Sequence, residues 1–146
     1  MTKDVLLKVR GLQFNGDPEA EKVETITPAQ YYLKNGGHYI LYDEIAEGLE
    51  ENTRNVIRIK DHELNIMKRG VINAEMLFTE NRKNLTSYGT PYGSIMVGID
   101  TNHMDVTEEE DLLRVHIDYA LELNHEHFAD CKLDIDVRPK EKGMLM

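Results

Sequence analysis

The chain has 146 residues, a length typical of one domain, and its 40% apolar and 30% charged residues are ordinary for a globular protein. The formal net charge of −10 argues against a nucleic-acid partner and against an anionic membrane surface, because phosphate groups are bound by basic patches. No apolar run approaches the ~18 residues of a membrane-spanning helix, so we expect no membrane partner.

The N-terminal part predicts three strands. The first alternates apolar and polar residues, and the second contains Pro28, which cannot donate to a central ladder. We therefore expect a bulge, a bend or a sheet edge at Pro28. Turn residues at 15–18 follow the first strand, and Asn35-Gly36-Gly37 favours the positive φ angles of a tight hairpin. The three strands are expected at Val5–Arg10, 22–33 and His38–Ile45.

The middle of the chain predicts five more short strands. Segment 43–51 is the best helical candidate, but it contains Gly48 and lacks a wide apolar stripe, so we expect one turn at most. Asp61-His62 makes a two-residue hairpin connection, and residues 81–84 make a polar turn. The strands are expected at Thr53–Lys60, Glu63–Arg69, Ala74–Thr79, Leu85–Thr90 and Tyr92–Thr101.

The acidic block 108–111 reads as a solvated connection into the strongest pattern of the chain. Residues 112–137 alternate apolar and polar in two passes, which predicts a long antiparallel hairpin with one buried face, turning at 124–127. Cys131 lies on the apolar parity, so we expect an inert buried thiol. We assign residues 1–139 to one domain and expect a disordered tail at 140–146.

About ten strands at this spacing predict an all-β fold with little helix, either a sandwich or a barrel. We favour a single antiparallel barrel of 8–10 strands, because the links are mostly hairpins and closure removes exposed edges. A lone cysteine excludes an internal disulfide, and the first residues lack a long apolar signal segment. We therefore expect a cytoplasmic protein.

Three segments carry a resemblance to a known family: Lys68-Arg69-Gly70, Met76-Leu77-Phe78, and the stretch from Ser87 to Gly93. In this respect the chain resembles the YwiB-like family of small bacterial proteins, from about Val5 to Val137. The resemblance implies a lipocalin-like (calycin) barrel and a bacterial cytoplasmic source. It implies no established catalytic or ligand-binding residues.

The parity of neighbouring strands suggests one polar site. Lys68 shares parity with apolar residues of its strand, and Glu44 shares parity with Ile40 and Tyr42. A Lys68–Glu44 pair at one barrel mouth is one interpretation, with Lys68 as a polar anchor for a ligand. The alternative is that Lys68 extends to solvent at the strand end. The sequence leaves open whether Lys68 or Arg69 points inward.

Tyr88-Gly89-Thr90-Pro91-Tyr92-Gly93 has two interpretations. Glycine and proline in strands usually mark a corner, where the tyrosines would pack. The same residues would also suit the rim of a pocket, with hydroxyl groups offered by Tyr88, Thr90 and Tyr92. The candidate ligand-binding residues are Tyr42, Glu44, Lys68, Arg69, Tyr88, Thr90 and Tyr92.

The sequence indicates no reaction. It contains no G-x-S-x-G elbow, phosphate-binding glycine loop or H-E-x-x-H motif, and we expect neither a cofactor nor a metal site. His125 and His127 lie close together on a predicted turn, but no third metal ligand is evident.

Two functions follow from this sequence. We expect a non-enzymatic barrel with a cavity of a few hundred Å³ that binds a small, largely apolar ligand. The alternative is an interaction or structural protein, a homodimer or a partner of another protein, that uses outward apolar residues. The outward apolar residues are Leu12, Phe14, Val56 and Leu77.

Overall fold

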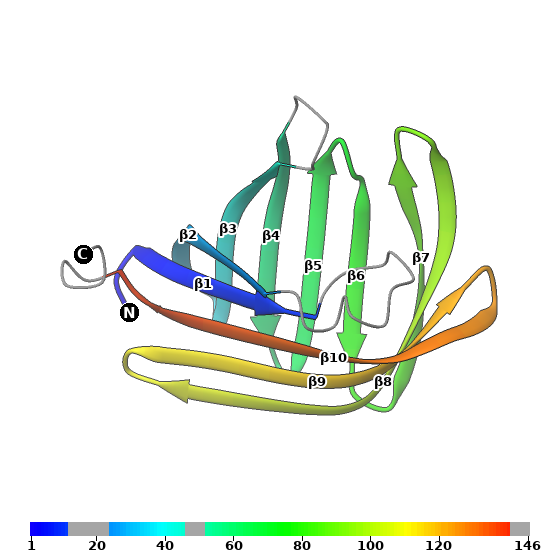
Figure 1. The fold of residues 1–146 in the computed structure, drawn as a ribbon. Coiled ribbons are helices and arrows are strands. Elements are labelled where there is room, and N and C mark those ends of the chain that lie inside the picture. The colour runs from blue at the N-terminus through cyan, green and yellow to red at the C-terminus, as the bar shows by residue number, and fades with distance from the viewer. Residues whose placement is uncertain (12–23, 46–51, 141–146) are drawn as a thin grey trace.

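Ten antiparallel strands form one nearly closed barrel in the computed structural model, which describes residues 1–11, 24–45 and 52–140 (Figure 1). The sheet runs in the order β6-β5-β4-β3-β2-β1-β10-β9-β8-β7. The strands are β1 (Asp4–Arg10), β2 (Glu24–Lys34), β3 (Gly37–Ile45), β4 (Asn52–Lys60), β5 (Glu63–Gly70), β6 (Ala74–Thr79), β7 (Arg82–Thr90), β8 (Gly93–Glu109), β9 (Leu112–Leu123) and β10 (Glu126–Pro139). The all-β barrel and the number of strands are as the sequence predicts.

The barrel closes between β6 and β7 without a continuous ladder in the described residues. Asn73 and Gly89 exchange two backbone hydrogen bonds of 2.9 and 2.8 Å across this seam. The Asn84 Nδ2 group adds a bond of 3.0 Å to the carbonyl oxygen of Leu77. One isolated bridge and one side chain therefore join β6 to β7 at the last seam of the wall.

The barrel wall also opens between β2 and β3. The two strands pair only from Gln30↔Leu41 to Lys34↔Gly37, while the earlier half of β2 pairs with β1. Pro28 lies in that earlier half, opposite Leu6 of β1 and without a bulge. A proline has no N–H to donate to β3. Of the bulge, bend or sheet edge predicted at Pro28, the structure shows the sheet edge.

Three hairpin turns use two successive residues with positive φ, the conformation that matches the twist of the flanking strands. Asn35 and Gly36 have φ angles of 52° and 78°, as expected. The Asp61-His62 turn has 50° and 60° without a glycine, and the closing turn has 51° and 70° at Asn124-His125. The closing turn is two residues long, because β10 already begins at Glu126.

Several predicted boundaries were wrong. The polar turn expected at 81–84 is shorter, since β7 begins at Arg82. The acidic block expected as a connection lies partly within β8, where Glu108 and Glu109 pair with the start of β9. Both segments are exposed, so their charges stay hydrated while the backbone continues the ladder. Of the helical candidate 43–51, residues 43–45 belong to β3, and the rest lies outside the described residues.

Three further expectations fall outside the described residues: the turn at 15–18, the start of the second strand at 22–23, and the tail from 141 onward. Lys140, which we had placed in the tail, still donates its backbone N–H to the carbonyl oxygen of Asp4 at 3.0 Å. The ordered backbone therefore extends at least one residue beyond the predicted domain end.

The interior of the barrel is packed with apolar side chains. Phe78 of β6 meets Tyr119 of β9 edge to face, with ring centroids 5.2 Å apart. Many core side chains have no exposed surface, and a void large enough for water would leave such surface on its walls. The side chains at 0% exposure include Leu7, Ile40, Ile57, Leu64, Ile66, Met76, Phe78, Ile99, Val115, Ile117, Leu133 and Ile135. The expected ligand cavity of a few hundred Å³ is therefore not found along these residues.

Candidate functional site

A buried lysine lies at one end of this apolar interior. Lys68 follows Leu64 and Ile66 on the inward face of β5 and is 4% exposed, whereas its neighbour Arg69 is exposed. Its Nζ donates to Asn55 Oδ1 at 2.8 Å and to Glu44 Oε1 at 3.1 Å. The structure thus places Lys68 inward and forms the Lys68–Glu44 pair that strand parity predicts.

Asn55 makes the burial of this ammonium group tolerable. Asn55 lies directly opposite Lys68 in the β4–β5 register and is itself fully buried. Its Nδ2 donates to the carbonyl oxygen of Thr53 at 3.2 Å, which fixes Oδ1 toward Lys68. Moving a charge out of water costs several kcal/mol unless acceptors replace the water, and Asn55 supplies an immobile one.

Glu44 is the exposed partner of Lys68. The side chain of Glu44 is 44% exposed to solvent, compared with 6% for that of Lys68. It lies in the half of β3 that has no pairing with β2, where the wall opens next to Pro28. Since water can hydrate Glu44 when it leaves Lys68, this partner is exchangeable, whereas Asn55 is not.

Two tyrosines border the same cluster. Burial, together with the nearby Glu44 carboxylate, raises the pKa of Tyr88 to about 12. Burial also raises the pKa of Tyr42 well above its usual value of 10, with smaller contributions from Glu44 and Tyr88. Both phenols therefore remain protonated at neutral pH and can donate hydrogen bonds.

The other predicted site residues make no hydrogen bond to the Lys68 ammonium group. Arg69 turns back along the backbone, where Nη1 donates to the carbonyl oxygen of Lys68 at 2.9 Å. Thr90 caps the β7–β8 turn: its Oγ1 accepts from the N–H of Tyr92 and donates to the Gly93 carbonyl. Tyr92 is 92% exposed at the tip of that turn. The segment around Pro91 is therefore a strand-to-strand corner, and within it Tyr88 lies close enough to Glu44 to feel its charge.

Gly70 fixes the chain at the end of β5. It has a φ of 146° and lies opposite Thr53 in the β4–β5 register. A Cβ atom at this position would lie 2.5 Å from the Asn52 carbonyl oxygen and 2.9 Å from Thr53 Cα. Glycine is therefore required for β5 to lie this close to β4 beside the Lys68 cluster.

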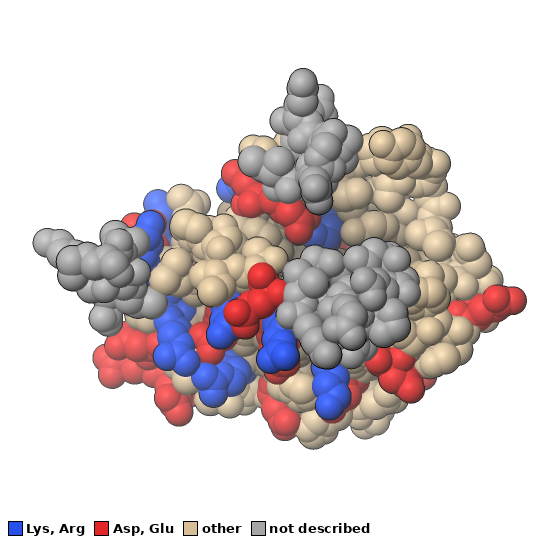
Figure 2. All heavy atoms as spheres, in the orientation of Figure 1, with Lys and Arg blue, Asp and Glu red and all other residues tan. Residues whose placement is uncertain are grey.

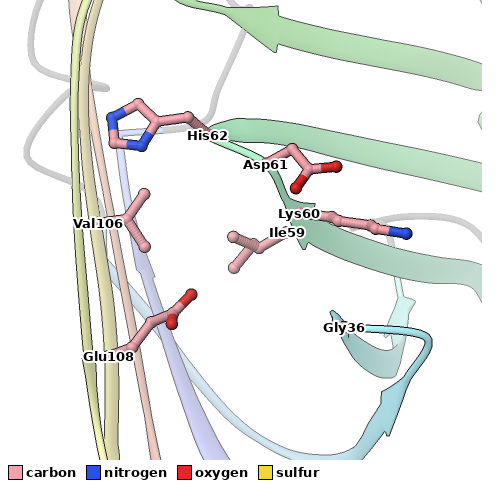
Figure 3. Close-up of a pocket in the computed structure, with 7 residues that line it drawn as sticks. All are labelled: Gly36, Ile59, Lys60, Asp61, His62, Val106 and Glu108. Atoms are coloured by element: carbon pink, nitrogen blue, oxygen red, sulfur yellow. The ribbon is translucent and has the colours of Figure 1, made fainter.

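The opposite end of β4 and β5 contains a hollow of about 290 Å³ that the sequence did not predict (Figure 3). It lies between the Asp61-His62 turn and β8. Figure 3 shows the side chains of Ile59, Val106 and Glu108 around one space. The lining residues are Gly36, Ile59, Lys60, Asp61, His62, Val106 and Glu108.

Three polar side chains from different strands join next to this hollow. The hydroxyl of Tyr31 lies 2.6 Å from His38 Nδ1, and His38 Nε2 lies 3.1 Å from Glu108 Oε1. The hairpin register would have suggested the first contact, since His38 faces Leu33, two residues from Tyr31 on the same strand face. The contact with Glu108 spans 70 positions, and no sequence signal indicates it.

The histidines form no metal site in the described parts of the chain, where no three His, Cys, Asp or Glu side chains gather around a common point. His127 lies 3.7 Å from Asp130, and both side chains are exposed. Cys131 is buried, as predicted. On the face drawn in Figure 2, acidic and basic side chains are interspersed over β1 and β10, so this face carries no continuous basic patch.

A family model described as a domain of unknown function, DUF1934, matches residues 7–135. The chain belongs to the DUF1934 family. The match begins within β1 and ends within β10, and it includes both polar clusters, Lys68 at one end and His38 at the other.

The crystal structure of the YwiB protein from Bacillus subtilis has the same fold, with a TM-score of 0.78 and 17% sequence identity. The similarity covers 95% of this chain and 93% of the B. subtilis chain. No curated protein matches the sequence. In the residues that the structure describes, no helix is long and apolar enough to cross a membrane.

Proposed function

We propose that this barrel is a non-enzymatic binding module that captures a small, largely apolar molecule at its Lys68 end. The observation that carries the proposal is a buried ammonium group with one fixed partner, Asn55, and one exchangeable partner, Glu44. A polar group of the ligand would take the place of Glu44 or of water next to it. Ligand sites commonly combine apolar walls with a few fixed polar groups.

The neighbouring side chains suit the apolar part of such a molecule. Tyr42 and Tyr88 bring aromatic rings beside Glu44, and Ile95 lies opposite Tyr88 in the β7–β8 register. Because the core below is packed, the ligand is placed at the mouth of the barrel and not within it. A lipocalin-like use of the barrel and a location in the bacterial cytoplasm belong to this proposal. They are supported by the fold and by the lone, buried cysteine.

Binding of 1-anilinonaphthalene-8-sulfonate, an apolar ring system with one anionic group, tests this proposal. We expect the unmodified protein to bind it and the Lys68→Met variant to bind it roughly 10- to 100-fold more weakly, since a hydrogen bond to a charged group contributes about 1.5–3 kcal/mol. Fluorescence titration gives the affinities, and thermal unfolding shows that each variant is folded.

Arg69→Met is the matched control, because it removes a cation from the adjacent residue on the opposite face of the same strand. Its affinity for the probe should equal that of the unmodified protein. Equal binding by the Lys68→Met variant, or an equal loss in both variants, would remove Lys68 from the proposed site.

A second candidate function is self-association, which a hollow of about 510 Å³ on the outer face of β2, β3 and β4 favours. Its walls include Val56, predicted for such a surface, and Tyr32, which is 39% exposed. Of the other predicted members, Leu77 lines a separate hollow next to β7, and Leu12 and Phe14 lie outside the described residues. Self-association predicts a dimer in sedimentation velocity runs that Tyr32→Lys converts to a monomer. A monomer at all concentrations excludes it.

A further inference from the structure

The ammonium group of Lys68 has one hydrogen-bond donor without an acceptor. A lysine ammonium carries three N–H groups. Asn55 Oδ1 accepts from one of them at 2.8 Å and Glu44 Oε1 from a second at 3.1 Å, and among the described residues Lys68 Nζ makes no further hydrogen bond. Lys68 is only 4% exposed, so the third N–H is poorly hydrated. An additional acceptor at this point would therefore complete the coordination of the ammonium group.

The hydroxyl of Tyr42 is a second donor next to Glu44. Tyr42 is 8% exposed and lies on the inward face of β3, two residues before Glu44. Its hydroxyl makes no hydrogen bond within the part of the chain that the structure describes. Burial and the Glu44 carboxylate raise the pKa of this phenol, so it keeps its proton at neutral pH. Lys68 and Tyr42 thus offer two donors on either side of one carboxylate.

A group that displaces Glu44 has to bring a negative charge. In the described residues Glu44 is the one carboxylate paired with Lys68, and the other partner, Asn55, is neutral. A buried ion that loses its counter-ion is strongly destabilising, because neither water nor an opposite charge compensates it. An alcohol in place of Glu44 would leave Lys68 in this state, and an ammonium group would add repulsion. A carboxylate would replace both the charge and the acceptor atoms.

The surroundings limit this negative charge to one. The chain carries a net charge of −10, and Glu44 stays near the site after it turns toward solvent. Both repel every further negative charge on the ligand. Asp43 does not change this balance, since it lies on the outer face of β3, 4.0 Å from Arg54. A single carboxylate therefore fits the site better than a phosphate or a dicarboxylate.

We propose that the ligand of the Lys68 end is a monocarboxylate with an apolar body, and that Glu44 takes the place of its carboxylate in the free protein. The ligand carboxylate would accept from Lys68 Nζ and from the Tyr42 hydroxyl. Glu44 then competes with the ligand, and its removal strengthens binding. This inference rests on the proposed function, because it names the chemical class that the same site takes.

Titration with three probes that share one apolar body tests the inference: 4-phenylbutyrate, 4-phenylbutan-1-ol and 4-phenylbutylammonium. Isothermal calorimetry at neutral pH should show that 4-phenylbutyrate binds at least 10-fold more tightly than the other two, and Lys68→Met should remove this difference. Glu44→Gln should raise the affinity for 4-phenylbutyrate roughly 5-fold, the equivalent of one ion pair with a half-exposed partner. Tyr42→Phe should weaken it about 10-fold, since one hydrogen bond to a charged acceptor is lost.

Asp43→Asn and Tyr39→Phe are the matched controls, because they make the same two changes on the outer face of β3. Both should bind 4-phenylbutyrate as the unmodified protein does. An equal rise in Asp43→Asn and Glu44→Gln would show a general effect of charge, and a weaker affinity in Glu44→Gln would make Glu44 a part of the site. Either result would overturn the inference.

The three probes also separate this inference from the proposed function. Equal, Lys68-dependent binding of the alcohol or of the ammonium probe would overturn the carboxylate and leave the binding module intact. Binding of none of the probes would overturn the inference, and the titration with 1-anilinonaphthalene-8-sulfonate would then decide the proposed function by itself. The comparison of probes uses the unmodified protein, so it gives an answer even where a variant fails to fold.

Discussion

Replacing Phe78 by alanine is expected to lower the free energy of unfolding by about 3–5 kcal/mol, the usual cost of removing a large buried aromatic side chain. Phe78 is 0% exposed and packs edge to face on Tyr119, so it joins β6 to β9 across the interior. Urea unfolding followed by circular dichroism measures the change.

Leu77→Ala provides the comparison for Phe78→Ala. Leu77 is the neighbouring residue on β6, faces outward and is only partly buried. Its truncation should cost clearly less than that of Phe78, because the lost contacts are on the surface. A Phe78→Ala variant no less stable than the Leu77→Ala variant would mean that the interior is loosely packed, contrary to the structure.

Gly70→Ala is expected to destabilise the protein by roughly 2–6 kcal/mol. A residue with a side chain at a φ of 146° costs about 1–3 kcal/mol. A Cβ atom 2.5 Å from the Asn52 carbonyl oxygen forces a backbone shift that costs about 1–3 kcal/mol more. Urea unfolding gives the total.

Gly93→Ala separates the two contributions to the Gly70→Ala result. Gly93 has a similar φ of 128°, but a Cβ atom there meets nothing within 4 Å. This variant should therefore show the conformational cost alone, about 1–3 kcal/mol. Equal losses at the two positions would indicate that β4 and β5 are not held as close together as the structure places them.

Alternation of apolar and polar residues was sufficient to predict most of the strands. The pattern is strong because one face of each strand meets a continuous core, as Val115 and Ile135 show with 0% exposure. The same parity placed Lys68 and Glu44 on inward positions of β5 and β3, and their contact follows from it. The role of the Lys68–Glu44 pair in ligand binding stays a prediction.

Composition was a poorer guide where a strand is exposed on its whole surface. The acidic composition around Glu108 and Glu109 suggested a connection, because like charges need hydration. In the structure both side chains are exposed to water, while their backbones pair with the start of β9. Because Glu108 was not assigned to a strand that could face His38, the cluster of Tyr31, His38 and Glu108 was not predicted either. Contacts across the barrel depend on closure, which no local pattern encodes.

A structure of the protein purified from its native cell, with any small molecule that it retains, tests the proposed binding site most directly. We predict that a polar atom of this molecule lies within hydrogen-bond distance of Lys68 Nζ. The Phe78–Tyr119 contact should remain intact beneath it. A molecule enclosed among the core side chains around Phe78, or bound on the outer face next to Val56, would contradict this prediction.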